Sequence, residues 1–177
     1  MRPLPLLAAA AAMAMAPASR AADPQVTTVD SVSLESVSTD TETTTVCRDD
    51  VVAVGNDITL HCDYLKVIST RIGDKSATIG KYGSFKYLLA TGHVVIVQGD
   101  RVATCGRAEV FPGEDKIVLT EGPVVEFKSQ GSKMSGPRMV LYRGQRRAVV
   151  EGTPSERSHI SLPPIKDLGF PTDKPSK

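Results

Sequence analysis

Apolar and polar residues alternate through much of the chain, and the alternation slips by one position at three similar places. Ile58, Leu60 and Cys62 occupy alternate positions, and the next apolar residues are Leu65 and Val67. The same spacing recurs in 105–110 and 136–141. Such a slip turns the apolar face of a strand to the other side of its sheet. We therefore predict that each run is one strand, bent at its small residue, whose two halves face one core from two sheets.

Glycines recur with these runs at a fixed period. Gly92, Gly122 and Gly152 are spaced by 30 residues, and Val94-Val95 returns as Val124-Val125 at the same distance. A period in this range indicates repeated supersecondary units. We predict a degenerate unit at 43–68, two full units at 86–111 and 116–142, and a partial unit at 147–152. No segment has a helical period, so the pattern predicts an all-β chain.

Residues that favour turns predict where the strands are connected. Within the second unit we predict turns at Thr91–Gly92 and at Gln98–Gly99, and the pair Asp49–Asp50 is expected in a turn as well. The polar, glycine-containing segment 69–84 is predicted as a loop around a short strand near 77–79.

Both ends of the chain differ from the repeats. Residues 1–21 combine Arg2, a short apolar run and the small residues Ser19 and Ala21, which is typical of a cleavable signal peptide and too short for a membrane span. Residues 22–42 are rich in Thr and Ser and predict a flexible leader, although three apolar residues near position 34 could make a weak edge strand. Residues 153–177 contain several prolines and predict a tail.

Charge and cysteine content exclude several classes of protein. The chain has 21 basic and 20 acidic residues, and loss of Arg2 and Arg20 with the signal would leave 19 and 20, a net charge of −1. A nucleic-acid-binding protein would carry a basic stripe instead. Three cysteines are an odd number, so a disulfide framework does not hold the fold. We expect Cys62 and Cys105 to be small buried thiols at the bends, and Cys47 to be the most exposed.

Reactive groups do not gather into a recognisable motif. The three histidines have no neighbours at metal-ligand spacing, and neither a GxSxG nor an HExxH sequence is present. We therefore predict no catalytic residue, no metal site and no cofactor. What remains is an aliphatic interior with few aromatic rings, which could close as an ordinary core or stay open and hold an acyl chain.

Residues 43–152 resemble the LptA/OstA-like family of periplasmic lipopolysaccharide-transport proteins. The likeness is carried by GNDITLHCDYLKV, ATGHVVIVQGDRVATCGRAEVF and IVLTEGPVVEFKSQGSKMSGPRMVLY, in that order. It implies a partly open, V-shaped β-jellyroll of two facing antiparallel sheets, with the acyl chains of lipid A between them. It also implies head-to-tail stacking of protomers, or stacking with other lipopolysaccharide-transport jellyroll proteins, as a bridge towards the outer membrane.

The first hypothesis is therefore a periplasmic lipopolysaccharide carrier whose inner face is apolar. The alternatives are a structural β-repeat module that pairs strand edges with partners and binds no lipid, and an exported enzyme of unknown type. The inner-face residues predicted to contact lipid are Ile58, Leu60, Leu65, Val67, Val102, Ala108, Val110, Leu119, Val125, Phe127, Met139 and Leu141. Around Leu89 and Leu119 both faces are apolar, so the sequence leaves their direction open.

Overall fold

The computed structural model describes residues 27–55 and 57–163, which form antiparallel β-strands and one short 3₁₀ turn. The predicted signal peptide and residues 164–177 of the predicted tail lie outside the described residues. The elements are β1 (Thr28–Asp30), β2 (Ser33–Ser38), β3 (Glu42–Val54), β4 (Ile58–Ile72), β5 (Lys81–Gln98), β6 (Arg101–Phe111), η1 (Pro112–Glu114), β7 (Lys116–Thr120), β8 (Val124–Phe127), β9 (Ser132–Ser135), β10 (Arg138–Tyr142), β11 (Arg147–Glu151) and β12 (His159–Ser161).

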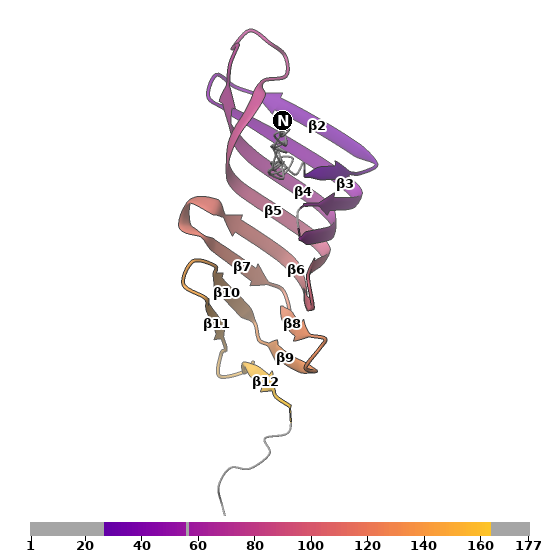
Figure 1. Ribbon diagram of the computed structural model, residues 1–177, viewed down its shortest axis with the longest axis vertical. Coiled ribbons are helices and arrows are strands. Elements are labelled where there is room, and N and C mark those ends of the chain that lie inside the picture. The colour runs from indigo at the N-terminus through magenta and orange to yellow at the C-terminus, as the bar shows by residue number, and fades with distance from the viewer. Residues whose placement is uncertain (1–26, 56, 164–177) are drawn as a thin grey trace, which may run out of the picture.

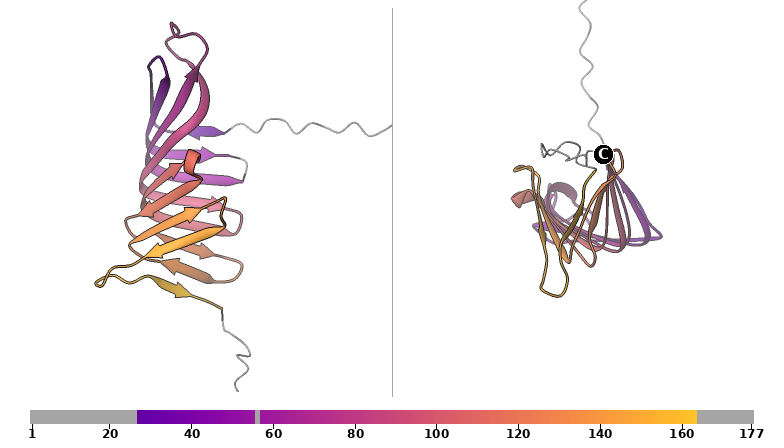
Figure 2. Two further views of the ribbon diagram at one scale, coloured as in Figure 1. Left: turned by 90° about the vertical axis from the view of Figure 1, so that its left-hand side faces the viewer. Right: turned by 90° about the horizontal axis from the view of Figure 1, so that it is seen from below.

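The strands are joined by hydrogen bonds into one 12-stranded sheet that folds into two layers. The division is clearest at β6, where residues 101–104 pair with β8 and residues 107–111 pair with β7. The strands stack along the long axis, from β2 at one end to β12 at the other (Figure 1). Seen along that axis, the two layers diverge as a V (Figure 2). The prediction of an all-β jellyroll of two facing antiparallel sheets is confirmed.

We name the two layers by their strands. Sheet 1 contains β2, residues 42–48 of β3, 64–72 of β4, 81–91 of β5 and 107–111 of β6, followed by β7, β10 and β11. Sheet 2 contains β1, residues 51–54, 58–61, 94–98 and 101–104 of the same long strands, followed by β8, β9 and β12.

Backbone irregularities mark the corner where strands pass between the sheets. The pairing register shifts between Arg48 and Val51, between His61 and Tyr64, and between Thr91 and Val94. Positive φ angles occur on this line at Asp49, Asp50, Gly92, His93, Glu121 and Gly122. These shifts confirm the predicted bends at Cys62 and Cys105, because each one restores the inward direction of the apolar face after the slip in alternation. The third predicted bend is wrong, because the strand is interrupted at 136–137 and its two parts are separate strands, β9 in sheet 2 and β10 in sheet 1.

The turn predicted at Gln98–Gly99 is confirmed between β5 and β6, but the other two predicted turns are wrong, because they are parts of continuous strands. Thr91–Gly92 is the bend inside β5, and Asp49–Asp50 is the bend inside β3. A left-handed backbone serves a bulge as well as it serves a turn, so Gly and Asp at these positions do not distinguish the two. The short strand expected near 77–79 is absent from the described structure, because β4 and β5 extend to residues 72 and 81 and leave a hairpin loop.

The predicted flexible leader is wrong for its described part, residues 27–42. β1 pairs with the second half of β3 through Val29 and Ala53, and β2 pairs with the first half of β3 along its whole length. Thr and Ser are compatible with an edge strand whose outer face is solvated. The deciding contribution is pairing with β3, which the local composition does not reveal. In the predicted tail, β12 pairs with β9, so 159–161 extends sheet 2.

The core follows the corner of the V. Leu65, Leu119, Met139, Val51 and Val94 are each at most 1 % exposed. They come from strands on both sides of the corner, so burial of their apolar surface holds the two sheets at the angle that creates the space between them.

Candidate functional site

An apolar cavity of about 170 Å³ lies between the two sheets, on the open side of the corner. Sheet 1 contributes Leu88, Ala90, Ala108, Val110 and Ile117, and sheet 2 contributes Ala53, Ile58, Leu60 and Ile96, with Thr27 and Gly55 at its edge. Apart from Thr27 the lining side chains are hydrocarbon, so the cavity favours an apolar occupant and offers no group for chemistry.

Cross-strand register explains how residues distant in sequence line one space. On sheet 1, Val67, Leu88, Val110, Ile117 and Leu141 are successive partners on neighbouring strands. On sheet 2 the corresponding row is Ala53, Leu60, Ile96, Ala103, Val125 and Met134. Directly paired residues point to the same side of a sheet. The two rows therefore give each sheet a continuous aliphatic inner face.

The structure places all but one of the predicted inner-face residues between the sheets. Leu60, Leu65, Ala108, Leu119, Val125 and Met139 are buried in the core cluster, and Val67, Phe127 and Leu141 pack against it. Ile58 and Val110 line the cavity. Only some of these residues are therefore positioned for a ligand, because Leu65, Leu119 and Met139 are already enclosed by protein.

Val102 is the exception, and its predicted inward direction is wrong. Its neighbour Ala103 belongs to the core cluster, while Val102 pairs with Val97 and Glu126 on the opposite face of sheet 2. Val102 lies one position off the alternation of Ala103 and Cys105, so its side chain faces away from the core. The ambiguity at 88–89 is resolved by Leu88, which lines the cavity, whereas Leu89 pairs with Glu109 on the outer face.

The sequence reasoning missed several cavity residues, chiefly Ala53, Leu88, Ala90, Ile96 and Ile117. A usable signal existed in the alternation itself. Ala90 is itself a core residue, and each of the others lies two residues from a core position on its own half-strand, such as Val51 for Ala53 or Leu119 for Ile117. Counting alternate positions in β5 also requires knowing where that strand bends, because alternation need not continue unchanged across a bend.

Buried thiols line the corner rather than the cavity. Cys47, Cys62 and Cys105 are free and 2 %, 5 % and 7 % exposed. Burial raises the pKa of Cys62 and of Cys105 to about 11, and the charge of Asp63 adds to the effect at Cys62. The prediction of buried corner thiols is confirmed, and the prediction that Cys47 is exposed is wrong, because Cys47 pairs with Leu65 on the inner face. A thiol with a raised pKa is a poor nucleophile and metal ligand.

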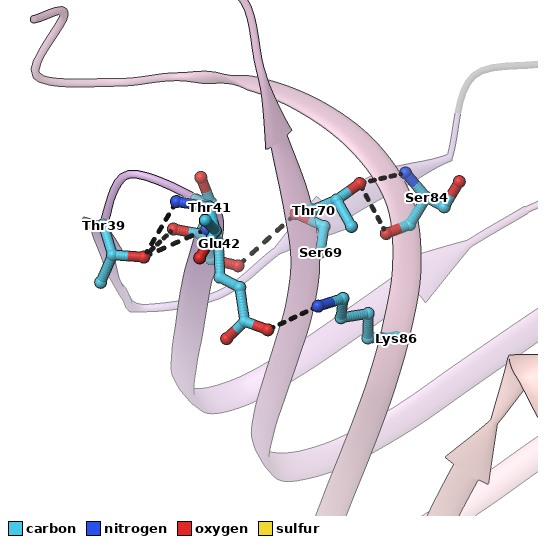
Figure 3. A network of polar contacts seen from close by, with 8 residues as sticks. Thr39, Thr41, Glu42, Ser69, Thr70, Ser84 and Lys86 are labelled. Atoms are coloured by element: carbon cyan, nitrogen blue, oxygen red, sulfur yellow. Dashed lines mark hydrogen bonds and ion pairs between the residues drawn. The ribbon is translucent and has the colours of Figure 1, made fainter. Parts of the chain in front are cut away.

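The inner face becomes polar at the end of sheet 1 nearest β2. There Ser36, Ser38, Thr43 and Thr45 replace the aliphatic residues of the later strands. The turn into β3 is closed by Thr39, whose hydroxyl accepts the backbone N–H of Glu42 at 3.1 Å (Figure 3). Glu42 and Thr70 alternate with the buried Thr43 and Ser69 and so lie on the other face of the sheet, where the backbone N–H of Ser84 donates to the Thr70 hydroxyl at 2.8 Å and Lys86 pairs with Glu42 at 2.7 Å (Figure 3).

A charged cluster occupies the outer face of sheet 1. The Tyr87 hydroxyl donates to Glu109 Oε1 at 2.5 Å, and Arg107 donates to the same oxygen at 3.0 Å. Burial, followed by the bond to Glu109, raises the pKa of Tyr87 to about 12. The bonds from Arg107 and Tyr87 lower the pKa of Glu109. These residues point away from the cavity, so we assign the cluster to the stability of the sheet.

Residues 27–55 and 57–163 contain neither a cluster of metal ligands nor a membrane-spanning helix. No group of three or more His, Cys, Asp or Glu side chains is arranged to hold a metal ion there. No helix in that part of the chain has the length and apolarity needed to cross a membrane.

Comparison with known proteins shows the family to which the chain belongs. Residues 28–147 match the model of a family described as the LptA/(LptD N-terminal domain) lipopolysaccharide (LPS) transport protein. The chain belongs to this family. It is accordingly a transport protein and not an enzyme, as the sequence predicted. A search of curated proteins returned no match.

A solved structure agrees with the family in fold. LptH from Pseudomonas aeruginosa, described as the LptA-homologous periplasmic component of the conserved lipopolysaccharide transport device, superposes with a TM-score of 0.60. The two sequences are 16 % identical, and the match covers 79 % of this chain and 96 % of LptH. At this identity the likeness establishes the shared jellyroll. The family match begins at β1, so the Thr- and Ser-rich strands lie inside the domain.

Proposed function

We propose that this LptA-family protein is a periplasmic carrier that holds the acyl chains of lipopolysaccharide between its sheets on the way to the outer membrane. The observation that carries the proposal is the apolar cavity on the open side of the corner, lined from both sheets. The signal-peptide pattern of residues 1–21 supports export to the periplasm.

The cavity size indicates how a lipid would be held. A cavity of about 150 Å³ binds one benzene-sized molecule, so about 170 Å³ accommodates part of one acyl chain. Several chains require the sheets to separate at the open side, while the packed corner keeps its contacts. Each CH₂ group moved out of water contributes about 0.8 kcal/mol, so even a partly inserted chain gains several kcal/mol.

A matched pair of variants on β6 tests the carrier. Val110→Asp places a carboxylate in the cavity, whereas Val102→Asp places one on the outer face of the same strand. A buried unpaired charge costs several kcal/mol. We expect Val110→Asp to lose photo-crosslinking to an acyl-diazirine lipopolysaccharide probe and Val102→Asp to retain it, with strand-type circular dichroism in both.

Two results would count against the carrier. If the folded wild-type protein never crosslinks, the structural-module alternative, in which strand edges bind partners and no lipid enters, takes its place. If Val102→Asp loses crosslinking and Val110→Asp does not, the lipid lies on the outer face of sheet 2.

The bridge function rests on the strand edges at the two ends. Among the described residues β1 and β2 pair only with β3, while β11 pairs only with β10 and β12 only with β9. An unpaired edge is a template for another strand. Joining the β1–β2 end of one protomer to the β11–β12 end of the next, or of another jellyroll of the transport system, would extend the groove in a head-to-tail array.

Sedimentation velocity over a range of concentrations tests this association. We expect a series of species that grows with concentration, because head-to-tail contacts do not close. A single dimer that stops growing would indicate a two-fold contact instead, and a strict monomer would remove self-association from the proposal.

A further inference from the structure

The hydroxyl-rich end of sheet 1 is in direct contact with the row that lines the cavity. Leu88 lines the cavity, its cross-strand partner is Val67, the partner of Val67 is Thr45, and the partner of Thr45 is Ser36. Neighbouring strands are about 4.8 Å apart, so Ser36 lies about 14 Å from Leu88 along one inner row. A ligand that occupies the cavity can therefore reach these hydroxyls without leaving the groove.

An aromatic side chain completes this polar end. Tyr82 of β5 reaches across β4, and its hydroxyl lies 3.2 Å from Thr45 Oγ1 and 3.4 Å from Ser36 Oγ, which are 3.3 Å from each other. Tyr82 remains 48 % exposed, and Phe85, the cross-strand partner of buried Ser69, is 56 % exposed. Ring surface is thus open to a ligand beside the hydroxyl groups.

The chemistry of this patch suits an uncharged, hydroxyl-bearing group. A hydroxyl offers one donor and two acceptor positions, so the three long mutual contacts leave hydrogen-bonding capacity unused. The nearby Arg71 guanidinium is engaged with the carbonyls of Thr39, Asp74 and Ala77, at 3.1, 2.9 and 2.6 Å. Ser36, Thr45 and Tyr82 themselves carry no charge that would select a phosphate, whereas a sugar ring presents both hydroxyls and an apolar face, which match the three hydroxyl groups and the exposed rings.

We infer that Ser36, Thr45 and Tyr82 form a subsite for a neutral sugar ring of a glycolipid whose acyl chain occupies the cavity. The inference rests on the proposed function, because the cavity supplies the acyl part of the site. It gives the Thr- and Ser-rich strands a role in orienting the ligand, with its sugar towards β2 and its chain towards β6.

The test compares octyl glucoside, octanol and glucose as probes of the purified protein, below the micelle concentration and by calorimetry. We expect octyl glucoside to bind more tightly than octanol and glucose to bind too weakly to detect. Thr45→Val and Tyr82→Phe each remove one hydroxyl and should weaken octyl glucoside about 2- to 10-fold, the effect of one neutral hydrogen bond, and leave octanol unchanged. Thr44→Val, on the opposite face of β3, is the control and should change neither.

The outcomes separate the subsite from the carrier. If octanol and octyl glucoside bind equally, or if Thr44→Val weakens the glucoside as much as Thr45→Val does, the subsite is overturned and the apolar cavity stands. If glucose binds as well as octyl glucoside, the site takes free sugar and the glycolipid assignment is overturned. If neither octyl compound binds, the result contradicts the proposed lipid-binding cavity, and the sugar subsite that depends on it is overturned as well. Tyr82→Phe, which removes one exposed oxygen, keeps the test valid should Thr45→Val be poorly folded.

Discussion

The bend at Gly92 offers a quantitative test of how the V is held open. Gly92 has φ +76°, and a Cβ built on it would lie 2.8 Å from the Cβ of Asp63 on β4. Gly92→Ala is therefore expected to lower the free energy of unfolding for two separate reasons. One is the left-handed backbone, and the other is steric overlap between neighbouring strands at the corner.

A second glycine separates these costs. Gly99, in the hairpin between β5 and β6, has φ +58° and no atom within 4 Å of a built Cβ. A left-handed conformation costs a residue with a Cβ about 1–2 kcal/mol, so Gly99→Ala should lower the free energy of unfolding by that amount. Overpacking adds about 1–3 kcal/mol. We therefore expect Gly92→Ala to lower it by about 2–5 kcal/mol.

Urea unfolding followed by circular dichroism measures the difference. With a slope of about 2 kcal/mol per molar urea, an excess cost of about 2 kcal/mol separates the two midpoints by about 1 M. Asp63→Gly combined with Gly92→Ala should recover the steric part, seen as a favourable coupling energy of about 1–3 kcal/mol in a double-mutant cycle. Equal midpoints for the two single variants, or no coupling, would refute the claim that close packing at the corner fixes the bend.

Two further predictions concern groups whose protonation depends on the fold. The pKa of Tyr87 is raised from 10 to about 12, so its contribution to stability is complete below pH 10 and is lost as pH rises towards 12; Tyr87→Phe should flatten this part of the stability–pH curve, and an unchanged curve would contradict the assignment. Cys47, Cys62 and Cys105 are buried, so Ellman's reagent should react with all three only as the protein unfolds in denaturant; a thiol that reacts at once in the native protein would show that the corner opens locally.

The sequence by itself determined the strand type and the two-layer plan. Alternation that slips by one at Cys62 and Cys105 admits few solutions, because an unbent strand would expose half of its aliphatic residues. The same counting placed Leu60, Leu65 and Ala108 inward, and the structure buries all three. These properties follow from local period and need no knowledge of which strands are neighbours.

Only the tertiary structure decided which residues form the groove and which close the core. Leu119 and Val110 have the same inward direction, yet Leu119 is enclosed at the corner while Val110 lines the cavity. Distance from the corner makes that difference, and it depends on where the two sheets diverge. The Thr- and Ser-rich strands were misjudged for a related reason: β2 is held by backbone pairing with β3, and its hydroxyls meet Tyr82 from a strand 46 residues away. Cross-strand contacts of that sequence separation leave no trace in local composition.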